Sequence, residues 1–307
     1  MRDVAAVVGP TAVGKSAVAE GLALALGGEI VSADSMQVYR GMDIGTAKMP
    51  PDARLVPYHC IDLVDPGSPY SAALYQRDAR AALADIDARG RSAVLVGGTG
   101  LYVRAALDAM EFPMGEYVSP VREAIERRAE ALGREGLHRL LEQRDPESAA
   151  LIHPNNVRRV VRALELLETG GPTYAEQATH FSERRTEVPA KLIGLTMQRS
   201  ALYARIDTRV DAMVADGLLD EVRTLLASGY RQALTAAQAI GYKELVPVVE
   251  AGAELEEAVA AIKQATRRYA KRQLTWFRAD PRIEWIDVTE LSSPDTVSAA
   301  QALVESR

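Results

Sequence analysis

The chain has 307 residues, of which 48% are hydrophobic and 25% charged, and its formal net charge is −6. This length allows one large α/β domain and a smaller partner domain, and the composition is that of a soluble globular protein. One cysteine excludes an internal disulfide, and four scattered histidines beside it give no zinc-binding spacing. The acidic net charge argues against a nucleic-acid partner unless basic residues gather on one face.

The sequence shows no segment that would target or anchor it to a membrane. The longest charge-free apolar stretch, residues 92–103, has 12 residues and contains glycines, so it is too short to span a bilayer. An apolar strand follows Met1 almost at once, without the regions of a signal peptide. We therefore expect a cytoplasmic protein without membrane contact. As a separate expectation, we take it to act as a monomer.

Apolar runs and helical segments alternate over the first 110 residues. Strands are predicted at 4–8, 29–33 and 92–96, and helices at 15–26, at 71–89 and after the glycine turn GGTG. This alternation predicts a parallel sheet with helices on both faces. Ligands of such sheets bind beyond the carboxyl ends of the strands, so the residues after Val8, Ala33 and Val96 should meet at one site.

The pattern changes between about residues 111 and 190, where helical sequence rich in Arg and Glu carries no strand signal. A strand pattern resumes at 191–197, helices follow from 201, and 283–288 is a candidate edge strand. We predict an α/β fold with a P-loop NTPase-like parallel sheet flanked by helices. Its core comprises residues 1–110 and 191–307, interrupted by an inserted all-helical domain at 111–190.

The segment GPTAVGKS at residues 9–16 follows a predicted strand, opens a helix and matches G-x-x-x-x-G-K-[ST] in full. Its glycines let backbone N–H groups point inward, and the helix N-terminus adds a positive end. Lys15 supplies a mobile cation, and Ser16 a hydroxyl for Mg²⁺. We predict that phosphate oxygens bind the whole segment, which consists of Gly9, Pro10, Thr11, Ala12, Val13, Gly14, Lys15 and Ser16.

Two more polar side chains follow predicted strands. Asp34 stands one residue past the second strand, so its carboxylate should face the loop and either hold Mg²⁺ or act as a general base. A turn or helix cap is its structural alternative. Thr99 follows the third strand and offers a hydroxyl to a bridging or leaving oxygen, or else caps a helix.

At this point several nucleotide-using proteins remain possible. A GTPase is disfavoured because no N-K-x-D motif is present. A small-molecule P-loop kinase using ATP accounts for the loop, the acidic surface and a lid built from Arg205, Arg209 and Arg223. The same arginines can instead pair with acids near them in the sequence, namely Asp207, Asp211 and Glu221. A non-catalytic RNA-binding protein is disfavoured because the loop and the two strand-end residues converge as a reaction site would.

One segment departs from the acidic average. Residues 261–282 contain seven basic residues against one acid, a local charge of +6, so the remainder of the chain carries −12. Lys263, Arg267 and Lys271 recur at four-residue spacing, as do Arg268 and Arg272, which places them on one helical face or two adjoining ones. This segregation indicates an anion-binding face, and a solvated helix surface is the alternative.

Seven blocks together resemble the bacterial tRNA dimethylallyltransferase family, also called tRNA isopentenyltransferases. In chain order they are GPTAVGKS, VSADSMQVYRGMDIGTAK, YSAALYQRDA, VGGTGLYVRA, IHPNNVRRVVRALE, AIGYKE and RRYAKRQLTWFR. The resemblance covers essentially the whole chain, and D-S-x-Q-V-Y and G-G-T-x-L-Y are more specific than the loop alone. A free-adenylate prenyltransferase shares the core motifs but has less use for an RNA-binding face.

The resemblance implies transfer of a dimethylallyl group from dimethylallyl diphosphate to N6 of adenine 37, in the anticodon stem-loop of tRNA. Diphosphate leaves, held by loop residues 9–16 and Arg223 and by Mg²⁺ at Ser16. Asp34, Thr99 and Lys15 would be catalytic, with Asp34 accepting the proton of the amino group. A closed apolar channel is expected around the allylic carbon, and its walls cannot be assigned from the sequence.

The residues that the resemblance places on tRNA come from the loop after the second strand, the helical insert and the C-terminal half. They are Asp34, Ser35, Met36, Gln37, Thr99, Arg122, Arg158, Arg159, Arg162, Gln238, Lys243, Arg267, Arg268, Lys271 and Arg272. Gln37 can present a donor and an acceptor together to an adenine edge. For any of the arginines an ion pair is the structural alternative, as between Arg162 and Glu165.

Overall fold

A computed structural model describes residues 3–112, 119–233 and 235–306. The chain forms two compact units, one made of Met1–Leu107 with Glu187–Arg307 and the other of Asp108–Thr186. The boundaries lie a few residues from the predicted 111 and 190. At the crossing, the carbonyl of Leu107 accepts from the N–H groups of Glu187 and Val188, and Ala109 donates to Arg185, so the two passing segments pair with each other.

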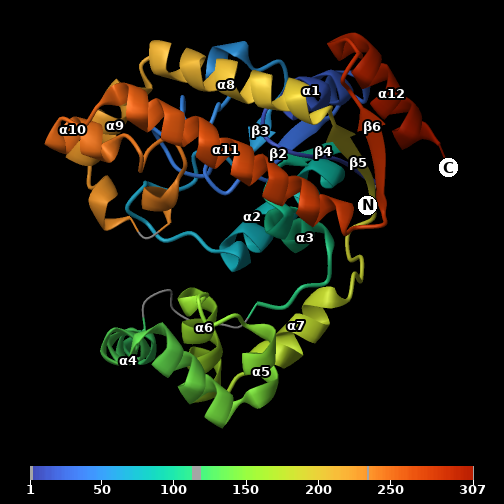
Figure 1. Cartoon of the computed structure of the whole chain (residues 1–307). Coiled ribbons are helices and arrows are strands. Elements are labelled where there is room, and N and C mark those ends of the chain that lie inside the picture. The colour runs from blue at the N-terminus through green and yellow to red at the C-terminus, as the bar shows by residue number, and fades with distance from the viewer. Residues whose placement is uncertain (1–2, 113–118, 234, 307) are drawn as a thin grey trace. The chain divides into compact units, whose positions relative to one another are not determined.

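The larger unit is built on a parallel sheet with the strand order β3-β2-β4-β1-β5-β6 (Figure 1). The strands are β1 Val4–Val8, β2 Glu29–Ser32, β3 Tyr58–His59, β4 Ala93–Gly97, β5 Ala190–Thr196 and β6 Ile283–Asp287. The predicted parallel α/β fold and the last edge strand are confirmed. The sequence did not reveal β3, because two residues are too few to show a strand periodicity.

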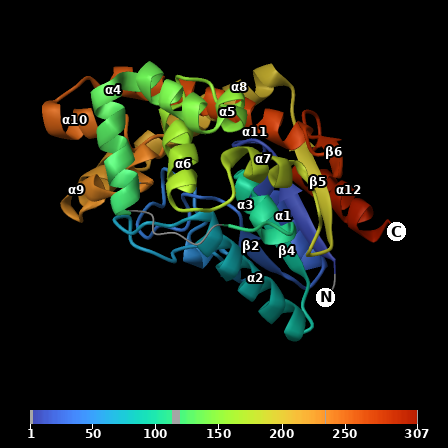
Figure 2. The same ribbon diagram turned by 90° about the horizontal axis from the view of Figure 1, so that it is seen from below.

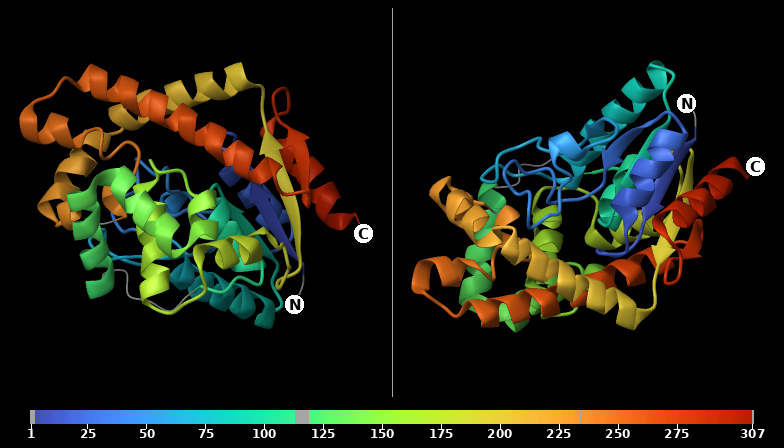
Figure 3. Two further views of the ribbon diagram at one scale, coloured as in Figure 1. Left: turned by 60° about the horizontal axis from the view of Figure 1, so that its bottom comes forward. Right: turned by 90° about the horizontal axis from the view of Figure 1, so that it is seen from above.

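Helices cover both faces of the sheet. The connections β1 to β2 and β2 to β4 cross it in opposite directions, so right-handed crossovers place α1 Lys15–Ala25 and α2 Ala72–Ala88 on opposite faces. Helix α12 Ser293–Glu305 packs beside α1, and α3 Gly100–Leu107 beside α2 (Figures 1 and 3). No helix in the described ranges combines the length and the apolar character that a membrane crossing requires.

A long helical segment follows β5. It comprises α8 Arg199–Ala215, α9 Leu218–Ala227, the 3-10 turns Tyr230–Gln232 and Ala236–Gln238, α10 Val246–Ala251 and α11 Leu255–Arg278. A further 3-10 turn, Pro51–Ala53, precedes β3. Helix α11 runs alongside α8 and reaches α3 at its other end (Figure 3). The C-terminal half of the chain is thereby brought to the edge of the sheet where the strands end.

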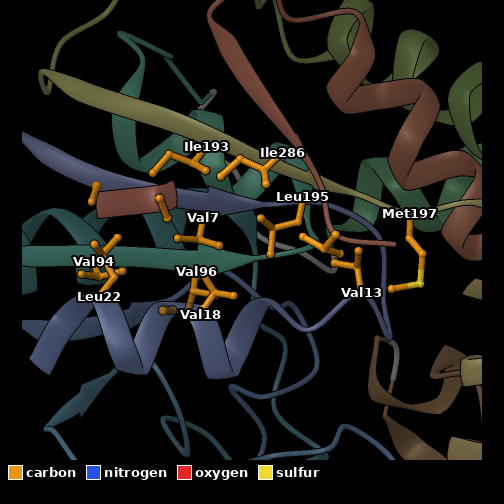
Figure 4. Packing of buried hydrophobic residues seen from close by; sticks show 14 of the residues in the cluster. Val7, Val13, Val18, Leu22, Val94, Val96, Ile193, Leu195, Met197 and Ile286 are labelled. Atoms are coloured by element: carbon orange, nitrogen blue, oxygen red, sulfur yellow. The ribbon is translucent and has the colours of Figure 1, made fainter. Parts of the chain in front are cut away.

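One large core cluster lies on the face of the sheet that α1 covers (Figure 4). Strand β1 is buried along its whole length, as expected of a central parallel strand covered on both faces. Val18 and Leu22 of α1 pack against Val94 and Val96 of β4, and burying each such side chain contributes about 1.5–3 kcal/mol. Val13 extends the cluster into the glycine-rich loop, so the loop is anchored by the core itself.

The smaller unit is helical in all its described elements. It contains α4 Pro120–Arg144, α5 Pro146–Leu151, α6 Val157–Glu168 and α7 Tyr174–Ser182 (Figure 2). Helix α4 packs along α6 around a core that includes Leu137, Leu141, Val160 and Leu164. The predicted all-helical insert is confirmed for these residues.

A buried carboxylate joins β2, β3 and α2 at the opposite end of β2 from the glycine-rich loop. Glu29 is 4% exposed, and both of its carboxylate oxygens accept from Arg89, while Oε2 also lies 2.8 Å from His59 Nε2. These hydrogen bonds, chiefly that of Arg89, lower the pKa of Glu29 to about 2, although burial opposes the shift. Glu29 is therefore a charged group that folding stabilises.

Glu29→Gln should lower the free energy of unfolding by about 2 kcal/mol near neutral pH. Because the folded-state pKa lies below the ordinary value of 4.5, this contribution is complete above pH 4.5 and is lost as the pH falls toward 2. Urea unfolding of both proteins across this range measures the difference. The control Asp85→Asn removes an exposed partner of Arg89 and should cost much less. A difference that stays constant down to pH 2 would contradict the assignment.

Candidate functional site

The glycine-rich loop, residues 9–16, joins β1 to α1 at the carboxyl edge of the sheet. Its Val13 is buried in the core, whereas Ser16 in the first turn of α1 is exposed. Gly14 is the N-cap and has no side chain to occupy the free N–H groups of the first turn. No acidic residue stands in that turn either. The start of α1 therefore presents the amide donors of a first helical turn and the positive end of a helix, which is a site for an anion.

Lys15 lies at the centre of this anion site. Its Nζ donates to the carbonyl of Pro10 at 2.7 Å. Burial, and after it the positive charge of Arg209, lower the pKa of Lys15 to about 7, although the charge of Asp34 acts in the opposite direction. The free site therefore supplies too little negative charge to stabilise the ammonium of Lys15, and a bound anion would supply that charge.

Arg209 supplies a second cation from a distant part of the chain. It lies on α8 and donates from Nη1 to the hydroxyl of Thr11 at 3.3 Å, and burial lowers its pKa. The carboxylates considered as its partners are taken by other groups: Asp207 pairs with Arg267, and Asp211 with Lys263. Of the three arginines considered from the sequence, Arg209 thus contacts the loop directly, and Arg205 lines the cavity between the loop and α8.

Arg223 does not lie against the glycine-rich loop. Its neighbour Val222 is buried in the apolar face of α9, which turns Arg223 outward, and its guanidinium pairs with Asp220 at 2.5 Å. Among the described residues, those lining the three cavities around the site do not include Arg223. Its expected diphosphate contact has no support from this location, because sequence spacing alone could not show which arginine the helix packing would direct inward.

The residues that follow β2 and β4 meet beside the loop, as predicted from the parallel sheet. Ala33 donates its N–H to Val96, and the N–H of Thr99 donates back to Ala33. Asp34 Oδ1 accepts from the N–H of Met36 at 2.9 Å, and Thr99 Oγ1 accepts from the N–H of Ser35 at 3.1 Å. The turn fixes one carboxylate oxygen of Asp34 and leaves the other available for a ligand.

Gln273 was not recognised from the sequence, yet it touches both turns of the site. Buried on α11, it accepts from the N–H of Thr11 at 2.8 Å through Oε1 and donates to the carbonyl of Gly98 at 2.9 Å through Nε2. A Cβ at position 98 would lie 2.1 Å from Gln273 Nε2, so a larger residue there would displace the carboxamide. Gln273 belongs to no recognised phosphate-binding motif, and only the alignment of α11 with the sheet reveals its role.

Tyr269, one turn before Gln273, is the second such residue. Its hydroxyl lies among Thr99, Gln273 and Asp34, and burial followed by the charge of Asp34 raises its pKa to about 12. It therefore stays protonated and can donate within the site. Neither residue could have been found from charge patterning, which drew attention to the neighbouring arginines of the helix instead.

Three cavities surround these groups. A small one of about 90 Å³ brings together Thr11, Lys15, Ser16, Asp34 and Gln37. A second, of about 560 Å³, lies between the loop and α8. The third, of about 460 Å³, extends from Asp34, Ser35 and Met36 between α8 and α11. Its apolar wall includes Ile206, Val210, Met213, Leu218 and Ile262, and its polar wall includes Gln238, Lys243, Arg268 and Arg272.

The basic residues of α11 divide into two sets. Lys263 and Arg267 pair with carboxylates of α8 at 2.6 and 2.7 Å. Arg268, Lys271 and Arg272 are exposed, and the described residues offer none of them an ion pair. The guanidinium of Arg272 stands over the ring of Tyr269, 5.5 Å from its centroid. The second set keeps its charge available to a partner.

The arginines of the smaller unit divide in the same way. Arg162 and Arg122 both approach Glu165, at 2.8 and 3.5 Å, and this carboxylate is only 4% exposed. The pair between Arg162 and Glu165 considered from the sequence is therefore present. Arg158 and Arg159 are exposed, without an ion pair to any described residue.

Comparison with known proteins gives consistent results along the chain. Residues 2–57 match the isopentenyl transferase family and residues 37–280 the IPP transferase family. The tRNA dimethylallyltransferase of Geobacillus thermodenitrificans is 50% identical over 285 residues, which are 92% of this chain and 90% of that protein. That of Symbiobacterium thermophilum is 52% identical over 284 residues, 92% of this chain and 88% of its own.

Two solved structures share the fold. The full-length tRNA isopentenylpyrophosphate transferase of Bacillus halodurans is 42% identical, with a TM-score of 0.72, and the match covers 99% of this chain and 96% of that one. A eukaryotic dimethylallyltransferase acting on tRNA is 29% identical, with a TM-score of 0.79, covering 99% of this chain and 78% of that one.

The affinity of the site for inorganic diphosphate should fall as the pH rises above 7. The free protein holds Lys15 with a pKa of about 7, and a bound anion raises that pKa, so the complex retains a proton that the free protein loses. The decrease approaches about tenfold per pH unit above 7. Calorimetric titration in two buffers of different ionisation enthalpy should show proton uptake. In Lys15→Met, only the protonation of diphosphate itself should make the affinity depend on pH. If the affinity of this variant varies with pH as that of the wild-type protein does, the prediction is wrong.

Proposed function

The chain belongs to the tRNA dimethylallyltransferase family, and from this membership and the geometry of the site we propose that it transfers a dimethylallyl group from dimethylallyl diphosphate to N6 of adenine 37 in tRNA, releasing diphosphate. The observation that carries the proposal is that Asp34 stands where two cavities meet. This residue lines both the small cavity at the glycine-rich loop and the 460 Å³ cavity with its apolar wall. The relatives and structures compared do not favour the kinase alternative.

The diphosphate binds at the loop. Backbone N–H groups, Lys15 and Arg209 surround the position where negative charge grows as the carbon–oxygen bond breaks, and such preorganised donors stabilise the transition state. The hydroxyl of Thr11, now held by Arg209, can donate to a diphosphate oxygen. Arg209 joins the expected set, and the diphosphate contact of Arg223 stays a prediction.

The residues present also fit Mg²⁺. Ser16 is exposed at the loop and lines the same small cavity as Asp34, and both offer the oxygen ligands that this ion prefers. The described residues contain no group of three or more His, Cys, Asp or Glu side chains that could hold a metal by themselves, so diphosphate and water would supply most ligands. When bound, the ion would neutralise charge on the leaving group.

Asp34 acts as the base for the acceptor. The lone pair of the adenine amino group is delocalised into the ring, so the nitrogen attacks well only as a carboxylate takes its proton. The carbon–nitrogen bond forms while the carbon–oxygen bond to diphosphate breaks, and the proton passes to Asp34. Thr99 and Tyr269 place hydroxyl groups beside this point, able to donate to the bridging oxygen.

The five-carbon group occupies the apolar end of the 460 Å³ cavity. The proposal assigns its walls to α8, α9 and α11, because Ile206, Val210, Met213, Leu218 and Ile262 line that cavity. An allylic carbon with cationic character reacts with water, and these side chains keep water away. The target base must leave its stack to reach Asp34, as is usual for enzymes that modify a base.

The unpaired cations bind the RNA. In the larger unit these are Arg268, Lys271 and Arg272, with Gln238 and Lys243 at the cavity mouth and Ser35, Met36 and Gln37 beside Asp34. In the smaller unit they are Arg158 and Arg159. Arg267, Arg122 and Arg162 support these surfaces through ion pairs. The proposal includes action as a monomer in the cytoplasm.

Incubation with dimethylallyl diphosphate, Mg²⁺ and unmodified tRNA should yield N6-modified adenosine, detected by mass spectrometry of tRNA digests. Asp34→Asn retains the acceptor for the Met36 N–H but loses the base, so the turnover rate should fall by about 10²–10⁴ while tRNA affinity changes little. A parallel fall of affinity and rate would contradict the base role. Transfer of labelled γ-phosphate from ATP to a small acceptor, without prenylation, would establish the kinase instead.

Neighbouring arginines on α11 give a matched test of the RNA face. Arg268→Ala should weaken tRNA binding and reduce the salt dependence of log K by about 0.7, because one phosphate contact is lost. Arg267→Ala should leave that slope unchanged and lower the thermal unfolding temperature, since Arg267 forms an ion pair with Asp207. Filter binding at several salt concentrations measures both slopes. Equal slopes for the two variants would show that the division of the basic residues is wrong.

A further inference from the structure

Glu221 gathers four hydrogen-bond donors on one carboxylate. It stands in the first turn of α9, and its oxygens accept from the N–H groups of Asp43 at 3.0 Å, Ile44 at 2.8 Å and Gly45 at 3.2 Å. The hydroxyl of Tyr242 donates to the same group at 2.6 Å. A carboxylate has only acceptors to offer, so it matches this set of donors as no amide could. The arrangement attaches residues 43–45 to α9.

The attachment leaves almost no room for movement. A Cβ at position 45 would lie 2.4 Å from the ring of Tyr242, so the backbone of Gly45 rests directly on that ring. Tyr242 is fully buried, and burial followed by the charge of Glu221 raises its pKa. Its hydroxyl therefore remains a donor at every physiological pH.

The next residue transmits this rigidity to Gln37. The carbonyl of Thr46 accepts from Gln37 Nε2 at 3.2 Å, and Gln37 Oε1 accepts from the hydroxyl of Ser32 at 2.9 Å. A carbonyl oxygen can only accept a hydrogen bond, so the side-chain atom of Gln37 that faces the Thr46 carbonyl must be its nitrogen. The Thr46 contact therefore sets the orientation of the Gln37 carboxamide. Gln37 lines the same small cavity as Asp34, and its remaining N–H and lone pair are available there.

We propose that Glu221 is a positioning residue that fixes the carboxamide of Gln37 so that the site accepts a 6-amino purine and rejects a 6-oxo purine. This inference rests on the proposed function. The amino group of adenine carries two hydrogens, one for Asp34 and one for Gln37 Oε1. Hypoxanthine instead places an oxygen against Oε1, and rotating the amide to relieve this would set Oε1 against the Thr46 carbonyl. Because Glu221 holds residues 43–45, the Thr46 carbonyl stays in place and prevents that rotation.

Binding of anticodon stem-loops with adenine or hypoxanthine at position 37 tests the inference, with no chemical step involved. The wild-type protein should prefer adenine. Glu221→Gln, whose amide nitrogen meets backbone N–H donors, should reduce the ratio of the two affinities by about tenfold. Asp220→Asn removes the same charge from the same turn of α9, but the Asp220 carboxylate pairs with the exposed Arg223, so this variant should leave the ratio unchanged.

A double-mutant cycle separates positioning from general stability. In a Gln37→Leu background, Glu221→Gln should have no further effect on the ratio, because the group through which it acts is gone. The proposal would be overturned if Glu221→Gln reduced the affinity ratio by the same factor in the wild-type and Gln37→Leu backgrounds. An unchanged affinity ratio in a folded Glu221→Gln protein would also overturn it. So would a wild-type protein that binds both loops equally.

A second variant covers the case in which Glu221→Gln does not fold. Gly45→Ala leaves Glu221 intact but pushes the segment off Tyr242, and should reduce the ratio in the same direction; an unchanged ratio would overturn the proposal. Failure of the proposed function is recognised separately, as the absence of prenylated product with wild-type protein and an adenine stem-loop.

Discussion

A single buried carboxamide holds the reacting groups together. Gln273 satisfies the N–H of Thr11 in the glycine-rich loop and the carbonyl of Gly98 in the turn after β4, two backbone groups that would otherwise be buried without partners. Each unsatisfied group would cost about 1–3 kcal/mol. Only a side chain with both a donor and an acceptor can serve the two. The position of Lys15 relative to Asp34 therefore depends on a helix more than 250 residues away in the sequence.

The charges of the site are balanced only when a ligand is present. The charge of Arg209 lowers the affinity of Lys15 for its proton, burial lowers that of both cations, and Asp34 is the carboxylate that opposes the shift at each of them. Without an anion the arrangement is unfavourable, and binding of diphosphate removes that cost. As the carbon–oxygen bond breaks, negative charge on diphosphate increases, so the same cations stabilise the transition state more than the ground state. The electrostatic imbalance is thus a source of catalysis in the proposed reaction.

The sequence predicted what local pattern and sheet geometry determine. A strand followed by GPTAVGKS located the loop, and parallel strands explained why Asp34 and Thr99 meet it. The choice of Arg209 over Arg223 was beyond such reasoning, because it depends on which face of α8 and α9 packs inward. Gln273 was missed for the same reason: a glutamine in a basic helix carries no signal until the helix is placed against two specific backbone groups.

The same limit applies to the basic residues of α11, and the acids of α8 explain their division. Asp207 and Asp211 are one turn apart, and they meet Arg267 and Lys263 in antiparallel order. The two ion pairs agree with the rotation of α11 about its axis that its buried face requires, which includes Ile262, Ala270 and Phe277. The adjoining face is then turned toward the cavity, with Arg268, Tyr269 and Arg272 among its lining residues. One set of basic residues therefore pairs with α8, while Arg268 and Arg272 line the cavity through which a flipped base would reach Asp34.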